Sequence, residues 1–292
     1  MFKGAITALI TPFKDDATID FDALAKIIEW QIAEGIEGLV PCGTTGESPT
    51  LSSEEQIAVI KTCVEVTRKR VPVIAGTGFN STKKTIEMTA MAKDAGVDAC
   101  LVVCPYYNKP SQDNLYHHFS DVAKTNIPII IYNIPSRTGV DLMPETVTKL
   151  AKNITNIIGI KDATANLERP LKTRILAGSD FCQLSGEDAT AAAFLAQGGH
   201  GCISVTANVA PKMCSDMQKF WQQGKFLECF NLRDKLMPLH EAMFVESNPG
   251  PVKYAASLLG ICSGISRAPL YGISEASKAK IAQIMKNIGI LS

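Results

Sequence analysis

Short apolar runs alternate along this chain with longer segments of helical period. Apolar runs of about four to eight residues between turn signals predict strands buried on both faces. The strand candidates are residues 4–10, 38–41, 71–75, 99–104, 127–132, 156–161, 181–185 and 201–205. The helix candidates lie near residues 21–34, 53–69, 81–95, 112–125, 144–152, 166–176, 187–197 and 210–222. We therefore expect eight consecutive strand–helix units.

Several predicted helices carry start and stop signals. Ser52-Ser53-Glu54-Glu55 offers a hydroxyl cap followed by acids in the first turn, and Pro144-Glu145 suits a first turn. Gly35, Gly96 and Gly198 fall where helices should stop, since glycine accepts the left-handed conformation of a helix end.

Eight strand–helix units with no other pattern predict a (β/α)8 TIM barrel. A doubly wound sheet is the alternative, but it usually has a glycine-rich phosphate loop after its first strand, and residues 7–12 (TALITP) do not resemble one. We expect residues 1–224 to form the barrel. Residues 225–292 continue with helical pattern and should pack on it as a three-helix extension (226–241, 252–259 and 275–288).

Composition and charge narrow the function. The chain has 292 residues, 46% of them hydrophobic, which is ample for a large core. Lys plus Arg equals Asp plus Glu at 29 each, and no basic run occurs, so nucleic acid and acidic membrane surfaces are poor candidate partners. No signal-peptide layout and no apolar stretch long enough to span a bilayer is present, so we expect no membrane association.

The nine cysteines are odd in number, scattered and free of any CxxC pair. Their apolar contexts, such as Ala99-Cys100-Leu101, are typical of small buried side chains in a reducing compartment. We therefore expect a cytoplasmic protein. Cys42 could be a reactive thiol, but we expect a buried, inert one.

Lys161 is the strongest candidate for chemistry. It ends the apolar run of residues 156–161 (NIIGIK), where an amine meets little solvent. Desolvation disfavours the ammonium, and a neutral amine can attack a carbonyl to form a Schiff base. The alternative is a strand-end lysine that extends its amine into solvent.

Polar residues gather at the ends of the predicted strands, where barrel active sites lie. The polar segments are Cys42-Gly43-Thr44-Thr45-Gly46-Glu47, Pro105-Tyr106-Tyr107-Asn108, Tyr132-Asn133-Ile134-Pro135-Ser136-Arg137-Thr138-Gly139, Lys161-Asp162-Ala163-Thr164, Ser185-Gly186-Glu187-Asp188 and Ser204-Val205-Thr206-Ala207-Asn208. Singly, each could be a turn, core packing or half of a surface ion pair. Together, around one strand-end lysine and a Gly-Thr-Thr-Gly turn that can donate to an anion, they predict a site for an anionic carbonyl compound.

Four of these motifs, in this order, resemble the signatures of the class I, pyruvate-dependent aldolase superfamily, and most closely those of its dihydrodipicolinate synthase family. They are Gly43-Thr44-Thr45-Gly46-Glu47, Tyr132-Asn133-Ile134-Pro135-Ser136-Arg137-Thr138-Gly139, Gly159-Ile160-Lys161-Asp162-Ala163-Thr164 and Ser204-Val205-Thr206-Ala207-Asn208-Val209. The resemblance runs from Gly4 to the last helix. It implies a TIM barrel and a lyase that condenses pyruvate with L-aspartate 4-semialdehyde, opening diaminopimelate and lysine biosynthesis. It also implies a homotetramer built as a dimer of dimers, and no metal or organic cofactor.

The resemblance assigns catalytic roles to four residues. Lys161 forms the Schiff base with the ketone of pyruvate. Tyr132 shuttles protons at the imine and the aldehyde. Thr44 links Tyr132 to Tyr107, and that Tyr107 comes from a neighbouring subunit.

Substrate-binding roles follow in the same way. Thr45, with nearby backbone amides, holds the pyruvate carboxylate, and Arg137 meets the carboxylate of the semialdehyde, for which a planar guanidinium is suited. Gly186 and Ile203 line the pocket through their backbones. Gly250 departs from the family, which usually has a branched apolar residue there, and this puts the local packing in question.

Other functions remain open at this point. An N-acetylneuraminate lyase or a keto-deoxy sugar-acid aldolase shares the lysine and the glycine-rich turn. Arg137 after Pro135-Ser136, and Thr44-Thr45 in place of a Ser-Thr pair, favour the synthase. A non-catalytic regulatory homologue should have lost Lys161 or Tyr132, and both are present.

Feedback by lysine is expected to be weak or absent. Where the family is inhibited, lysine binds near residues matching Ser48, Asn80 and Tyr106, all kept here. The position that supplies a carboxylate for the ammonium of the ligand is Lys84 in this chain, so an attraction becomes a repulsion.

Overall fold

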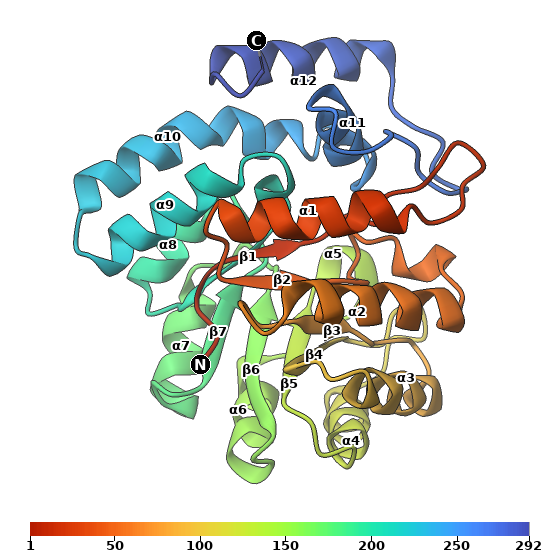
Figure 1. Cartoon of the computed structure of the whole chain (residues 1–292). Coiled ribbons are helices and arrows are strands. Elements are labelled where there is room, and N and C mark those ends of the chain that lie inside the picture. The colour runs from red at the N-terminus through yellow and green to blue at the C-terminus, as the bar shows by residue number, and fades with distance from the viewer. Residues whose placement is uncertain (292) are drawn as a thin grey trace.

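A barrel of parallel strands surrounded by helices forms the core of this protein (Figure 1). The computed structural model describes residues 1–291. The strands in this range are β1 (Gly4–Ala8), β2 (Gly38–Val40), β3 (Ile74–Gly76), β4 (Ala99–Val103), β5 (Ile129–Asn133), β6 (Ile157–Asp162), β7 (Cys182–Ser185) and β8 (Gly201–Ser204). The helices are α1 (Phe21–Ala33), α2 (Ser53–Thr67), α3 (Thr82–Asp94), α4 (Gln112–Ala123), α5 (Pro135–Thr138), α6 (Pro144–Asn153), α7 (Glu168–Ala177), α8 (Ala191–Ala196), α9 (Pro211–Gln222), α10 (Phe226–Ala242), α11 (Gly250–Leu258) and α12 (Glu275–Asn287), with short 3-10 turns η1 (Ser48–Thr50) and η2 (Thr206–Asn208).

The strand order confirms the predicted TIM barrel. Neighbouring strands pair in the order β2-β1-β8-β7-β6-β5-β4-β3, and every pairing is parallel. The ends of this sheet meet through a parallel bridge between Leu39 and Val73. The Leu39 amide donates to the carbonyl of Pro72 at 3.0 Å, and the Gly76 amide donates to the carbonyl of Pro41 at 2.9 Å. The barrel is therefore closed, with no exposed sheet edge at this seam.

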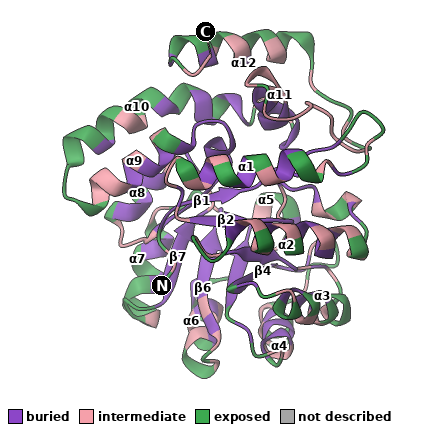
Figure 2. Cartoon of the chain, in the orientation of Figure 1, coloured by how far each residue is buried: buried purple, intermediate pink, exposed green. Residues whose placement is uncertain are grey.

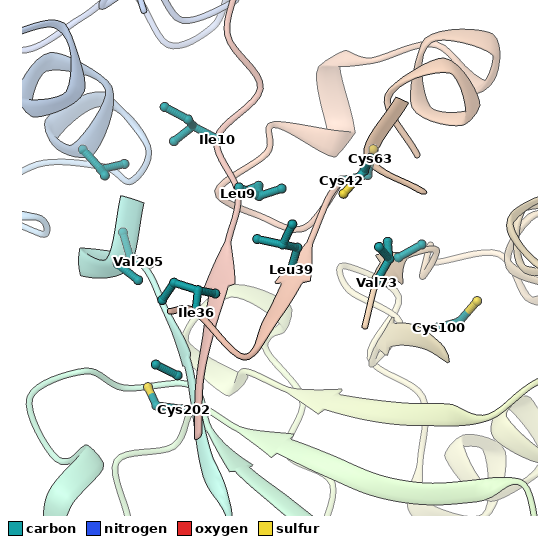
Figure 3. Close-up of a cluster of buried hydrophobic side chains, with 14 of the residues drawn as sticks. Leu9, Ile10, Ile36, Leu39, Cys42, Cys63, Val73, Cys100, Cys202 and Val205 are labelled. Carbon is teal, nitrogen blue, oxygen red and sulfur yellow. The ribbon is translucent and has the colours of Figure 1, made fainter. Parts of the chain in front are cut away.

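Successive side chains of each strand point alternately into two hydrophobic layers. Side chains such as Ile6, Ile130 and Leu184 fill the barrel interior, whereas another cluster lies between the strands and the helices. Figure 2 shows the strands buried and the outer faces of the helices exposed. Figure 3 shows part of the outer layer, with Leu9 and Leu39 among its labelled side chains. This two-sided burial explains why the strands are almost wholly apolar.

The helix signals read from the sequence are confirmed. Ser52 and Glu55 form a reciprocal capping box, and Pro144 is the first residue of α6. Gly35, Gly96 and Gly198 have φ values of 86°, 88° and 90°, the left-handed conformation expected after a helix.

Two predicted boundaries were wrong for physical reasons. Strand 71–75 starts later, at Ile74, and extends to Gly76, where a Cβ would lie 2.2 Å from the carbonyl oxygen of Cys42. The helix predicted at 187–197 is confined to α8, because the Asp188 carboxylate instead accepts from the backbone amides of Val205 and Thr206, at 2.9 and 3.1 Å.

The segment from residue 225 onward holds α10, α11 and α12, which lie together on one side of the barrel (Figure 1). Helix α10 packs on α9 and α12, and α11 packs on α12. Within residues 1–291, no helix has the length and hydropathy needed to cross a bilayer. The loop before α11 brings residues of this segment to the turn that follows β2.

Candidate active site

Lys161 and Tyr132 are direct neighbours inside the barrel. Residues paired across parallel strands point to the same face, and Lys161 is paired with Tyr132 of β5 on one side and Leu184 of β7 on the other. Both neighbours belong to the interior cluster. The Lys161 side chain is 6% exposed, and its Nζ lies 4.2 Å from the centroid of the Tyr132 ring. The alternative of a lysine that extends into solvent is therefore wrong.

Gly186 leaves room for the Lys161 side chain. A Cβ on Gly186 would lie 2.6 Å from the Cβ of Ala163 and 3.1 Å from the Cε of Lys161. The Gly186 amide donates to the carbonyl of Asp162 at 2.7 Å, which ties β7 to the end of β6. Ile203 of β8 is buried in the same interior cluster as Tyr132. The structure thus gathers these predicted site residues at one end of the barrel.

Residues from the N-terminal and the C-terminal parts of the chain contact the Gly-Thr-Thr-Gly turn and the residue after it. The Thr11 hydroxyl donates to the carbonyl of Gly46 at 2.7 Å. Glu47 has a φ of 55° and is buried, and its carboxylate pairs with the ammonium of Lys253. It also accepts from the amide of Arg267 at 2.9 Å. Three separate segments therefore hold the turn that carries Thr44 and Thr45.

Arg137 lies on the short helix α5, which the sequence did not predict. Its side chain is exposed, and its Nη2 donates to the carbonyl oxygen of Asn248 at 3.4 Å. Arg137 and Thr44 both line a hollow of about 350 Å³, together with Tyr106 and Asn248. Lys161 and Tyr132 are not part of its lining. The hollow therefore does not enclose the lysine.

Tyr107 stands apart from these residues in the single chain. Its side chain is 89% exposed and its backbone has a φ of 72°. Within residues 1–291, no hydrogen bond joins the Tyr132 phenol, the Thr44 hydroxyl and the Tyr107 phenol. The relay through these three residues stays a prediction, and it needs a second copy of the chain to supply Tyr107.

Charged residues behind the strand ends hold β5 and β6 in register. Arg169 donates to Asp162 at 3.0 Å and to Asp141 at 2.9 Å. Asn133 donates to the other oxygen of Asp141 at 2.7 Å. Asn133 and Asp162 are themselves paired across the strands, directly after Tyr132 and Lys161. This network fixes the backbone that carries the Tyr132 and Lys161 side chains.

Acidic side chains lie near Lys161. Burial raises the pKa of the Glu187 carboxyl, and the neighbouring Asp188 raises it further, while the Lys161 ammonium opposes both. All nine cysteines are unpaired. Burial raises the pKa of the Cys42 thiol far above its usual value, in agreement with the inert role expected for it.

The sequence reasoning missed Asn248, Lys253 and Arg267, which reach the turn after β2 from the C-terminal segment. One signal was available, because Lys253 is a single charge among apolar residues directly after Asn248-Pro249-Gly250-Pro251. The question raised by Gly250 is also answered. A Cβ there would lie 2.9 Å from the Cγ2 of Ile273, so Ile273 occupies the space of the missing side chain.

The chain is closely similar to known proteins along its whole length. The model of the dihydrodipicolinate synthetase family matches residues 1–288. A 4-hydroxy-tetrahydrodipicolinate synthase from Rhodospirillum centenum is 57% identical and one from Acidiphilium cryptum is 55% identical, each with all of both chains covered. A crystal structure of chloride-inhibited dihydrodipicolinate synthase from Acinetobacter baumannii, complexed with pyruvate, is 42% identical with a TM-score of 0.97 over all of both chains.

These relatives confirm the predicted family and the predicted class of enzyme, a lyase of lysine and diaminopimelate biosynthesis. The TM-score of 0.97 agrees with the barrel. This chain belongs to the dihydrodipicolinate synthetase family.

Proposed function

We propose that this chain condenses pyruvate with L-aspartate 4-semialdehyde, the activity of a 4-hydroxy-tetrahydrodipicolinate synthase, through a Schiff base on Lys161. The observation that carries the proposal is the position of the Lys161 amine, buried at the mouth of the barrel against the Tyr132 ring. A buried lysine whose amine lies against an aromatic ring inside the barrel is placed to act as a nucleophile.

The reaction follows from the chemistry of the amine. The Lys161 nitrogen adds to the ketone of pyruvate and water leaves, which gives an iminium. The iminium accepts electrons, so the methyl group loses a proton and becomes an enamine. The enamine carbon bonds to the aldehyde of the second substrate. The amino group of that substrate then attacks the imine carbon, the ring closes, and Lys161 is released.

The other residues serve binding and proton transfer in this proposal. Tyr132, through Thr44 and the Tyr107 of a neighbouring copy, moves protons at the imine and the aldehyde. Thr45 donates to the pyruvate carboxylate, and Arg137 meets the carboxylate of the semialdehyde. The exposed fork of Arg137 beside the hollow supports this role.

The same proposal includes a homotetramer formed as a dimer of dimers. Its support is the exposed Tyr107, which the mechanism requires inside a site. We also infer a cytoplasmic enzyme, because nine unpaired cysteines suit a reducing compartment.

One assay tests the function against its nearest rival. The enzyme is supplied with pyruvate and L-aspartate 4-semialdehyde in one reaction and with N-acetylneuraminate in another. We expect product only in the first reaction. Cleavage of N-acetylneuraminate without condensation of the semialdehyde would assign the chain to the other activity.

A further inference from the structure

Asn248 connects the two residues proposed to bind carboxylates. It precedes α11 and is 5% exposed. Its side-chain Nδ2 donates to the Thr45 hydroxyl oxygen at 3.1 Å, across 203 positions of the chain. Its backbone carbonyl accepts from the Nη2 of Arg137 at 3.4 Å. One residue of the C-terminal segment therefore contacts both anion-binding groups.

The direction of the first hydrogen bond decides what Thr45 can do. A threonine hydroxyl has one hydrogen to donate and two lone pairs that accept. Because the Asn248 amide is the donor, the Thr45 hydrogen is not consumed in this contact. Within residues 1–291, no other group accepts it either. The hydroxyl is thus prepared to donate to a bound carboxylate, and the incoming donor makes it a better one.

Packing alone does not account for an amide at this position. The Oδ1 of Asn248 is buried and has no partner among the described residues. A buried acceptor without a donor lowers stability, and an apolar side chain of similar size would remove that defect. The one hydrogen bond that the Asn248 side chain makes, in contrast, is directed at Thr45 of the site. The contact with Arg137 is made by the backbone carbonyl and does not depend on the side chain.

We infer that Asn248 is a positioning residue whose side-chain amide orients the Thr45 hydroxyl toward the pyruvate carboxylate. The inference rests on the proposed function, and it assigns part of the substrate affinity to the C-terminal segment. The Asn248 side chain acts through Thr45 and does not take part in bond making.

The test compares Asn248→Asp with Asn248→Ala in the full-length enzyme. An aspartate has nearly the same shape, but it accepts where the amide donates, so it takes the Thr45 hydrogen and adds a negative charge near two anionic substrates. We expect the KM for pyruvate to rise about tenfold in Asn248→Ala, and more in Asn248→Asp, as for a lost hydrogen bond to a charged group. We expect kcat to change much less. Asn287→Asp, an exposed site on α12, adds the same charge elsewhere and should leave the KM unchanged.

A double mutant separates positioning from general damage. Thr45→Val removes the hydroxyl, so adding Asn248→Ala to it should raise the KM for pyruvate little further. Unchanged KM values in both Asn248 variants, or an equal further loss on the Thr45→Val background, would overturn the inference. If Asn248→Asp does not fold, the KM values of Asn248→Ala and of the double mutant still test the inference. A wild-type enzyme that forms no pyruvate adduct on Lys161 contradicts the proposed function instead, so the two failures are distinct.

Discussion

Glu47 and Lys253 form an ion pair that is almost completely removed from solvent, although 206 positions of sequence separate them. The Lys253 side chain is 0% exposed, and its Nζ also lies 3.9 Å from the centroid of the Phe13 ring. Burial lowers the pKa of the Lys253 ammonium, and the Glu47 carboxylate opposes that shift. The pair fixes the end of the turn that carries Thr44 and Thr45, so helix α11 supports the active site as well as the fold.

Breaking this pair should be costly. Lys253→Met leaves a buried carboxylate without a counter-charge, and we expect a loss of about 3–5 kcal/mol in the free energy of unfolding. Adding Glu47→Gln should restore part of that loss, because the unpaired charge is gone. Denaturant unfolding measures both. The exposed pair Lys172–Glu168 supplies the control, since Lys172→Met should change stability little. Equal effects in the two lysine variants would show that the buried pair has no special role.

The exposed Tyr107 predicts a site shared between subunits. Tyr107→Phe should lower turnover by roughly a hundredfold or more, as expected for a lost proton-transfer group, without a change of fold. Mixed dimers of Tyr107→Phe with Lys161→Ala should regain some activity, because one of the two sites then holds both native residues. Turnover of the mixture against each parent measures this. If mixing never restores activity, Tyr107 does not act across an interface.

Lys84 predicts weak feedback by L-lysine. Its Nζ lies 4.3 Å from the centroid of the Phe79 ring, at the edge of a surface hollow that Lys83, Glu54 and Glu87 also line. At position 84 alone, an ammonium stands in place of the carboxylate that inhibited relatives are expected to have, so an attraction for the ligand becomes a repulsion. We expect Lys84→Glu to lower the half-inhibitory concentration of lysine about tenfold, and initial rates across a lysine titration measure it. Half-inhibition of the wild-type enzyme well below about one millimolar would contradict this interpretation of Lys84, because L-lysine would then bind more tightly than to a weak site.

His118 predicts a loss of stability in mild acid. Burial lowers its pKa from 6.5 to about 4, and its Nδ1 pairs with the Thr82 hydroxyl at 2.9 Å. In the unfolded chain His118 takes up a proton below pH 6.5, whereas in the folded protein its imidazole stays neutral down to about pH 4. Stability should therefore fall by up to about 3 kcal/mol as the pH drops through this window.

The test of His118 compares the pH dependence of unfolding in three proteins. His118→Asn keeps a polar group near Thr82 but cannot titrate, so its stability should vary less between these pH values than that of the wild type. His117→Asn alters the exposed neighbour and should behave like the wild type. An unchanged pH dependence in His118→Asn would assign the acid sensitivity to other groups.

The fold was predictable because its strands are buried on both sides. Runs such as residues 127–132 are almost wholly apolar, so the strand can be predicted even when its first and last residues are misplaced by one or two positions. Short elements were less predictable. Gly76 joins β3 by pairing with Leu101 of β4, and the Asp188 carboxylate accepts from the amide of Val205 after β8 instead of standing in a longer α8.

The location of the candidate site residues was predictable where a short motif contains them. Lys161 and Tyr132 lie next to the last residues of their strands and Gly186 directly follows β7, and the barrel brings strand ends together. Their roles stay predictions. Asn248, Lys253 and Arg267 act on a turn about 200 positions away, and no local pattern encodes such a contact.

The Schiff base on Lys161 is the central claim, and chemical trapping tests it most directly. The enzyme is incubated with pyruvate and borohydride, digested, and its peptides are mapped by mass spectrometry. We expect a reduced pyruvyl group on Lys161 and none on Lys253, the other buried lysine of this end of the barrel. Lys161→Ala should lose both the adduct and the activity. An adduct on another lysine, with Lys161→Ala still fully active, would contradict the account.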